Sequence, residues 1–341
     1  MIRHAEALLG ALRSVQETLR DAVIEACEQR EVEDLARVVE DGHGDTTFAL
    51  DRVGEHRLVE LFLPVAREWT CVLVAEGLPP EGIVLPEGTS RERAEIVVIV
   101  DPIDGTRGLM YQKRSAWILA GAAPNRGDAT SLADIDVAVQ TEIPILKQHL
   151  VDCAWAIKGR GSAAERLDRV TGKRQPFRLR PSSATTVAQG FGGLARFLPG
   201  GRSVLAAIDD AVYERLLGVP RPGQAQAFED QYICSGGQLY ELITGHDRWI
   251  ADLRPLLRAR GVAHGLCAHP YDLCTELIAR EAGVLVTDAA GDPLTAPLDT
   301  TTDVAWVGYA NAAIRGMVEP ALRSALSQFD LIGRVLALEN Q

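Results

Sequence analysis

The sequence predicts a layered α/β fold built from two subdomains. Amphipathic segments, with apolar residues every three or four positions, alternate with short continuous apolar runs. This is the pattern of helices packed on sheets that are covered on both faces. The chain has 341 residues, which is long for one small domain and sufficient for two packed subdomains. Apolar residues make up 47% of the chain, which is enough for a sizeable core.

The first half is expected to contain two helices followed by a group of strands. Apolar residues recur with helical spacing over 8–27 and again over 50–67. Between them, an acidic and helix-prone stretch extends to residue 40, and Asp41–Gly44 is expected to form a turn or a flexible loop. Uninterrupted apolar runs predict strands at 71–75, 96–100, 115–123, 135–143 and 151–157.

A polar and basic stretch over residues 166–183 separates this half from the next. We therefore expect an N-terminal subdomain over 1–185 and a C-terminal subdomain over 186–341. In the second subdomain, strands are expected at 187–191, 247–253, 284–287 and 304–307. Helices are expected at 203–217, 231–243, 271–281 and from 311 onward. The sequence contains no internal repeat.

Charge and cysteine usage limit the classes of partner. With 35 basic and 47 acidic residues, the formal net charge is −12, which argues against a nucleic-acid polymer as partner. A small anionic substrate stays compatible, because bound cations can invert the local field. None of the six cysteines forms a Cys-x-x-Cys pair, and no apolar signal core or long membrane span is present. These features predict a cytoplasmic protein with reduced thiols and no membrane partner.

The most informative local feature is the string Asp101-Pro-Ile-Asp-Gly-Thr106, which follows the apolar run at 96–100. Pro102 fixes its backbone φ and lacks an N–H donor, and Asp104-Gly favours a second turn. Two carboxylates are therefore expected on a tight loop beyond the end of a buried strand, where open α/β sheets commonly bind ligands. Asp-Pro and Asp-Gly are also ordinary turn formers, so the string alone does not distinguish a site from a turn.

A second acid, Glu76, follows the apolar run at 71–75. If the two strands are neighbours, Glu76, Asp101 and Asp104 converge, and three carboxylates without basic partners repel one another unless a cation lies among them. Hard oxygen ligands of this kind suit Mg²⁺. The Asp-x-x-Asp-Gly-Thr spacing also differs from the Asp-x-Asp-Gly-Thr of haloacid-dehalogenase-type phosphatases, which disfavours an aspartyl-phosphate mechanism.

Four blocks of the chain, taken in order, resemble the inositol monophosphatase superfamily. That lithium-sensitive group also includes fructose-1,6-bisphosphatases and 3′(2′),5′-bisphosphate nucleotidases. The blocks are Gly44–Asp51, Val74–Glu76, Asp101–Thr106, and Asp272 with its following helix to Gly283. The resemblance implies a five-layer α-β-α-β-α sandwich, a phosphoric monoester hydrolase, and a homodimer by analogy.

The resemblance also implies metal ligands. Glu76, Asp101, the backbone carbonyl of Ile103, Asp104 and Asp272 would hold about two to three Mg²⁺ ions, with Asp101 bridging two of them. Li⁺ would inhibit. Asp272 has a second interpretation as the N-cap of the helix that follows it, and the two roles are compatible.

The remaining roles concern the reaction itself. Asp51 and the Thr106 hydroxyl would orient and deprotonate a metal-bound water, with Glu76 completing the catalytic set. The backbone N–H groups of Gly105 and Thr106 would bind the substrate phosphate. At Arg107, directly after this motif, the sequence resembles the bisphosphate nucleotidase branch of the superfamily.

Departures from the family pattern concern metal affinity and specificity. Many relatives carry a second acid after the metal-binding Glu, where this chain has Gly77. The inositol monophosphatases also carry a Lys ahead of a mobile loop, and the nearest counterpart in this chain is the acidic Glu40. The connection 253–270 is longer than in many small relatives and could form a rim over the pocket. Equally, Arg254, Arg258 and Arg260 could lie on a solvated helix face, which is the favoured interpretation for Arg258 and Arg260. Specificity is expected in the second subdomain, where the candidate contacts are Gln238, Asp247, Asp252 and Arg254.

The sequence thus predicts Mg²⁺-dependent hydrolysis of a small phosphomonoester, on a sugar, polyol or nucleotide, by metal-activated water. The alternative within enzymes is a 3′(2′),5′-bisphosphate nucleotidase. The alternative outside enzymes is a non-catalytic protein that binds metal or a phospholigand.

Overall fold

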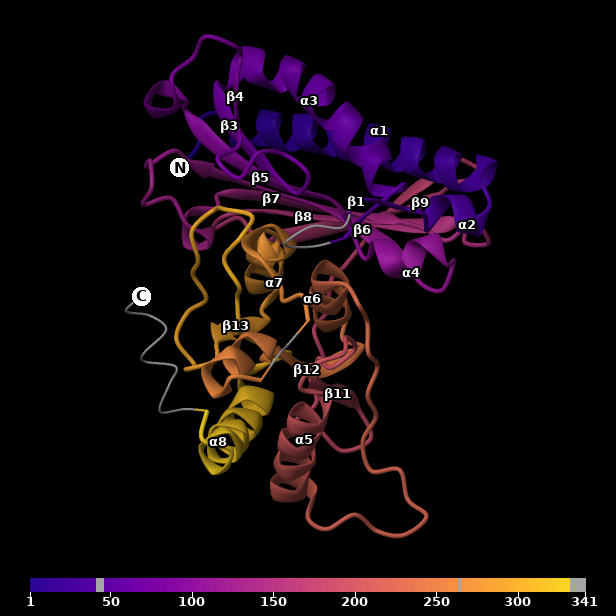
Figure 1. Cartoon of the computed structure of the whole chain (residues 1–341), viewed down its shortest axis with the longest axis vertical. Helices are drawn as coiled ribbons and strands as arrows, with labels where there is room; N and C mark the ends of the chain where they lie inside the picture. Colours follow the sequence, from indigo (N-terminus) through magenta and orange to yellow (C-terminus); the bar gives the residue numbers. More distant parts are fainter. Residues whose placement is uncertain (41–45, 263–264, 332–341) are drawn as a thin grey trace.

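Two β-sheets and three layers of helices alternate in the order α-β-α-β-α (Figure 1). This computed structural model describes residues 1–40, 46–262 and 265–331. The five-layer architecture confirms the fold class expected from the sequence. The turn expected at Asp41–Gly44 lies outside the described residues.

The first sheet has eight strands in the order β10-β9-β8-β7-β6-β5-β3-β4. Its strands are β3 (Cys71–Ala75), β4 (Ile83–Leu85), β5 (Ile96–Asp104), β6 (Ala116–Pro124), β7 (Val137–Ile143), β8 (Leu150–Ile157), β9 (Ser162–Asp168) and β10 (Arg174–Phe177). Strands β3 and β5 are parallel, and every other neighbouring pair in this sheet is antiparallel. Helices α1 (Ala5–Gln29) and α3 (Asp51–Glu68) cover its outer face.

The continuous apolar runs arise because this sheet is buried on both faces. Side chains alternate along a strand, so each strand supplies two cores. In β5, Val97 and Ile99 face the helices between the sheets, whereas Ile96, Val98 and Val100 face α1 and α3. A run that is apolar at every position therefore marks a central strand.

The second sheet has four strands in the order β11-β12-β14-β13. They are β11 (Phe191–Leu194), β12 (Asp247–Asp252), β13 (Leu285–Asp288) and β14 (Trp306–Tyr309). Helices α6 (Ser235–Ile243) and α7 (Glu276–Ala282) pack between the two sheets. Helices α5 (Arg202–Leu217) and α8 (Ala312–Gln328) cover the outer face.

Short elements complete the chain. They are α2 (Val32–Leu35), β1 (Val38–Glu40), β2 (Thr47–Phe48), α4 (Thr106–Met110) and the 3₁₀ turns η1 (Arg91–Arg93), η2 (Leu132–Asp134), η3 (Arg254–Arg260) and η4 (Pro270–Leu273). Strands β1 and β2 pair with each other in antiparallel register. Within the described ranges, no helix is both long and apolar enough to cross a bilayer.

Several expected elements differ in the structure. The helix-prone stretch that was expected to reach residue 40 ends at Leu35, and the next residues form β1. The polar stretch 166–183 contains part of β9 and all of β10, because strands at a solvent-exposed edge need no continuous apolar run. The strand expected at 187–191 begins only at Phe191. The division of the chain at residue 185 stays a prediction.

Candidate metal centre

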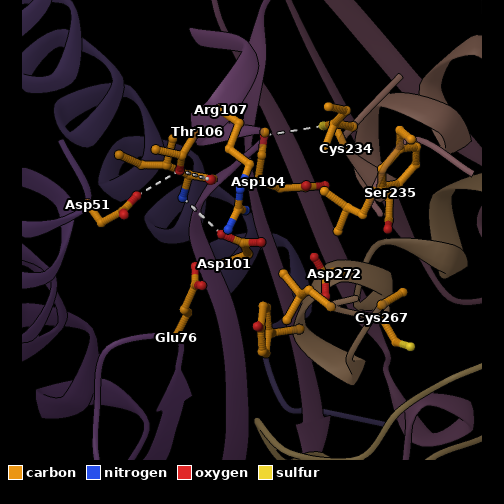
Figure 2. A pocket seen from close by; sticks show the side chains of 18 of the residues that line it. Asp51, Glu76, Asp101, Asp104, Thr106, Arg107, Cys234, Ser235, Cys267 and Asp272 are labelled. Carbon is orange, nitrogen blue, oxygen red and sulfur yellow. Dashed lines mark hydrogen bonds between the residues drawn. The ribbon is translucent and has the colours of Figure 1, made fainter. Parts of the chain in front are cut away.

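Two acids reach the site because their strands are parallel neighbours. Ala75 of β3 lies opposite Val100 of β5 in the sheet register. Glu76 and Asp101 are the next residues along the two strands, so they lie at the same edge of the sheet. Figure 2 shows the carboxylates of Glu76, Asp101 and Asp272 directed toward one space from different elements.

A bulge in β5 aims the two aspartates of the motif. Asp101 pairs with Leu119 of β6 and Asp104 pairs with Trp117, so β5 has one residue more than its partner over this interval. Pro102 suits this bulge because it has no N–H to place in the ladder. The expected loop beyond the strand is therefore wrong: the strand continues through the bulge to Asp104.

The third aspartate of the cluster comes from η4, between the two sheets. One carboxylate oxygen from each of Asp101, Asp104 and Asp272 lies within 4.8 Å of the other two. Asp272 Oδ2 accepts the backbone N–H of His269 at 2.6 Å, which holds the 3₁₀ turn. Its expected role as the N-cap of the following helix is wrong, because α7 starts at Glu276.

Burial and mutual repulsion govern the charge of this cluster. Asp101 is only 1% exposed, and its burial raises the pKa of its carboxyl well above the ordinary value, with further contributions from Glu76, Asp104 and Asp272. Burial likewise raises the pKa of Asp104, and the charge of Asp272 adds to it. Converging, buried, oxygen-only donors fit a hard divalent cation such as Mg²⁺, which would offset the repulsion.

The Asp51–Thr106 pair stands next to the cluster. Thr106 Oγ1 lies 2.7 Å from Asp51 Oδ1 and 2.9 Å from the carbonyl oxygen of Ile103. The hydroxyl carries one proton, so it donates to one of these acceptors at a time. The second oxygen of Asp51 accepts the backbone N–H of Phe48 at 2.7 Å. Both oxygens of this carboxylate are thereby held in place at the start of α3.

The turn between Asp104 and Thr106 needs a glycine. Gly105 has φ 99°, in the left-handed region, and a Cβ there would lie 3.2 Å from the sulfur of Cys234. The thiol of Cys234 donates to the Asp104 carbonyl at 3.2 Å and accepts the Gly237 N–H at 3.2 Å. The thiol therefore joins this turn to the first turn of α6.

The start of α6 also contacts the cluster directly. The backbone N–H of Gly236 donates to Asp104 Oδ2 at 2.6 Å. A Cβ at Gly236 would lie 2.5 Å from Leu119 and 3.0 Å from that carboxylate oxygen, so this close approach requires glycine. The sequence predicts a helix over 231–243 but gives no role to Cys234 and Ser235, which line the pocket. The Cys-Ser-Gly-Gly start of the helix was the available signal.

The pocket over the cluster has a charged floor, and its wall combines apolar and polar side chains. The site residues expected from the sequence that line it are Asp51, Glu76, Asp101, Ile103, Asp104, Gly105, Thr106, Arg107, Arg254 and Asp272. Apolar side chains on its C-terminal side are Phe197, Leu198, Ile233, Leu266, Ala268 and Tyr271. The connection 253–270 thus contributes to the wall, as the rim interpretation expected.

The guanidinium of Arg254 is held in this wall. Its Nε donates to Asp252 Oδ1 at 2.8 Å, and a second nitrogen pairs with Asp252 Oδ2. A third nitrogen donates to the Leu266 carbonyl, and the group lies 4.4 Å from the ring centroid of Phe197. Arg254 and Asp252 are 4% and 1% exposed, so they form a buried ion pair that fixes the wall.

Three of the expected specificity residues do not line the pocket. Gln238 is buried in α6 and its amide donates to the Tyr232 carbonyl at 2.9 Å. Asp252 reaches the wall only through Arg254, and Asp247 lies at the start of β12. Their expected contact with substrate stays a prediction that the lining of this pocket does not support. The sequence could not show this, because burial of a polar residue depends on its long-range neighbours.

Comparison with known proteins establishes the fold. No protein-family model matches the sequence, and no curated protein matches it. Among solved structures, SuhB of Bartonella henselae is 16% identical with TM-score 0.62, over 93% of this chain and 98% of that one. Fructose-1,6-bisphosphatase of Leishmania major is 14% identical with TM-score 0.65, over 95% and 96%. Inositol monophosphatase II of Staphylococcus aureus is 15% identical with TM-score 0.60, over 95% and 97%. The chain therefore shares the fold of these proteins almost end to end, which confirms the resemblance noted in the sequence at the level of the fold.

Proposed function

We propose that this protein is a phosphoric monoester hydrolase that acts on a small phosphate ester with the help of Mg²⁺. The supporting observation is the presence of two arrangements in one pocket. The first is the buried carboxylate cluster of Asp101, Asp104 and Asp272, with Glu76 beside it. The second is the Asp51–Thr106 hydrogen bond. The fold shared with phosphatases supports the same reaction class.

In this proposal, each residue has a defined task. Bound Mg²⁺ would polarise the phosphate ester and lower the pKa of a water molecule. The carboxylates of Glu76, Asp101, Asp104 and Asp272, with the Ile103 carbonyl, would hold the metal.

The reacting groups lie beside these ligands. The Thr106 hydroxyl lies 2.7 Å from Asp51, so it can accept a proton from the attacking water and pass its own to that carboxylate. The N–H groups of Gly105 and Thr106 would bind the phosphate of the substrate. No side chain forms a covalent bond in this scheme.

The test is phosphate release over a panel of sugar phosphates, inositol phosphates, mononucleotides and nucleoside bisphosphates. Each compound is assayed with Mg²⁺, with chelator, and with Mg²⁺ plus Li⁺. Turnover that needs Mg²⁺ and falls with Li⁺ is expected. No turnover anywhere on the panel would favour a non-catalytic protein that binds metal or a phospholigand.

A nucleoside bisphosphate is a second candidate substrate, because aromatic side chains line the pocket beside its carboxylates. Phe48 and Arg107 both line the pocket, and the Arg107 guanidinium lies 5.5 Å from the Phe48 ring centroid. Phe197 and Leu198 line the pocket as well. Flat bases stack on such side chains, whereas a polyol would leave its hydroxyls against them. A preference for adenosine 3′,5′-bisphosphate over inositol phosphates would support this candidate.

Assembly and location complete the proposal. By analogy with the resembling family, we propose a cytoplasmic homodimer without a membrane or nucleic-acid partner. Light scattering on the purified chain distinguishes a dimer from a monomer. A monomer at micromolar concentration would contradict the dimer.

A further inference from the structure

A second pocket, of about 440 Å³, lies where the end of α1 approaches the start of α3. We call it the arginine pocket. Its lining residues are Arg30, Arg37, Val39, Ala49, Arg52, Val53 and Arg57. Arg30 follows α1, Arg37 precedes β1, and the other two arginines belong to the first turns of α3. Separate segments of the chain thus place four arginines around one cavity, together with the apolar residues Val39, Ala49 and Val53.

Three of the four arginines have no ion-pair partner among the described residues. In the part of the chain that the structure describes, Arg30, Arg37 and Arg57 make no ion pair or side-chain hydrogen bond. Arg52 pairs with Glu55 at 2.9 Å. None of the described lining residues is acidic. Arg30, Arg37 and Arg57 therefore bring three guanidinium charges that no ion pair within the described residues offsets.

This local charge opposes that of the whole protein. The net charge of −12 disfavours anions at long range, and salt screens charges that are separated by more than about 10 Å. The three guanidinium groups without an ion pair also repel one another. A bound anion removes that repulsion and receives paired N–H donors from several arginines at once. The arrangement thus favours an anion that is small enough to contact several of these groups together.

We propose that the arginine pocket binds a small, multiply charged phosphorylated molecule, separately from the metal centre. Its volume lies in the range of pockets that take small molecules. A concave cavity suits a soluble ligand that is surrounded by several donors. The apolar side chains of Val39, Ala49 and Val53 would contact an uncharged part of the ligand beside its phosphate.

The same short segments form the two pockets. Phe48 lines the metal pocket and its neighbour Ala49 lines the arginine pocket. The N–H of Ala49 donates to the carbonyl of Arg37 at 2.9 Å, and Arg52 directly follows Asp51. An anion that ties Arg37 to Arg52 would therefore steady the residues that hold the Asp51 carboxylate.

The experiment measures binding of inorganic pyrophosphate to the full chain by calorimetry, with chelator present. Without metal, the carboxylates at the metal centre repel anions, so this probe reports the arginine pocket. We expect one pyrophosphate per chain. In Arg37→Gln/Arg57→Gln the affinity should fall about tenfold or more, because two charge-assisted contacts are lost. Both side chains are exposed, so the double variant should fold, which circular dichroism checks.

The matched control is Arg67→Gln/Arg93→Gln, which removes the same charge from exposed positions outside the arginine pocket. This variant should bind pyrophosphate as the parent chain does. An equal loss of pyrophosphate affinity in both double variants would show non-specific electrostatic attraction and overturn the proposal. So would the absence of saturable binding, or binding that the first double variant leaves unchanged.

Discussion

At the scale of single residues, Asp101 combines burial with the proximity of three other carboxylates. It is nearly inaccessible, and three other carboxylates raise its pKa in addition to its burial. Its Oδ1 accepts the N–H of Ile103 at 2.9 Å, so its orientation is set by its own strand bulge. A side chain that is costly to bury and rigidly aimed indicates a function other than stability.

Replacing Asp101 by Asn should therefore separate activity from folding. We expect Mg²⁺-dependent phosphate release to fall at least about 10²-fold, because a residue that would hold the metal loses its negative charge. The metal-free variant should be no less stable than the parent chain, since one repelling charge is gone. Activity assays and urea unfolding measure the two effects. The control is Asp128→Asn, at an exposed carboxyl; retained activity in Asp101→Asn would reject its proposed role.

Substitution of Thr106 tests the proton path and leaves every carboxylate of the site unchanged. Thr106→Ala removes the hydroxyl that lies 2.7 Å from Asp51, and kcat should fall about 10²–10⁴-fold while Mg²⁺ affinity is retained. Thr106→Ser keeps the hydroxyl and should restore most of the rate. Equal loss in both variants would mean that the methyl group, and hence packing, explains the effect.

At the scale of elements, the start of α6 and the bulge of β5 are joined by one thiol. Cys234 caps α6 through the Gly237 N–H and donates to the Asp104 carbonyl. Cys234→Ala should lower the free energy of unfolding by about 1 kcal/mol, the usual effect of losing a cap. Because Asp104 loses a restraint, we also expect weaker Mg²⁺ activation. Cys234→Ser, which keeps a donor and acceptor, should restore the activation; if it does not, the contact of sulfur with Gly105 matters more.

The same two elements show what the sequence could and could not predict. The runs that became β3 and β5 were recognisable because both of their faces are buried, and parallel pairing then placed Glu76 beside Asp101. Strand β10 was missed because its exposed edge position leaves no apolar pattern. Cys234 was missed because its role depends on Asp104, which lies far away in the sequence and meets it only in the folded chain.

At the scale of the whole molecule, metal should contribute to stability. A ligand that binds only the folded chain stabilises it by about 2.7 kcal/mol when its concentration is 100 times Kd. We expect Mg²⁺ to raise the thermal midpoint of the parent chain and chelator to reverse the shift. Asp101→Asn should show a smaller shift, and Asp128→Asn the full one. A thermal midpoint that does not change when Mg²⁺ is added would contradict the proposed metal centre.

A buried acid outside the metal centre should make stability depend on pH. Burial raises the pKa of Asp247 to about 7, and Glu241 and Asp230 add to this, while His246 and Arg114 oppose it. The folded chain thus holds a proton that the unfolded chain has released above about pH 4. Asp247 therefore contributes stability at low pH that is lost as the pH rises toward 7.

Asp247→Asn should remove this dependence. Relative to the parent chain, the free energy of unfolding of the variant should rise between about pH 4 and 7, by at most about 1.4 kcal/mol per pH unit. At pH 8 the variant should remain the more stable of the two. Urea unfolding at several pH values measures the difference between the two chains. A difference that does not change with pH would contradict the raised pKa.

The position of Asp272 has a consequence for synthesis of the chain. Glu76, Asp101 and Asp104 emerge from the ribosome early, whereas α6 and Asp272 come from the second sheet's half of the fold and emerge late. Domains generally fold from the N-terminus during synthesis, so the first sheet can form while its carboxylates still face water. The proposed enzyme would thus remain inactive on the ribosome, and it would acquire activity only after α6 and Asp272 had packed against the first sheet.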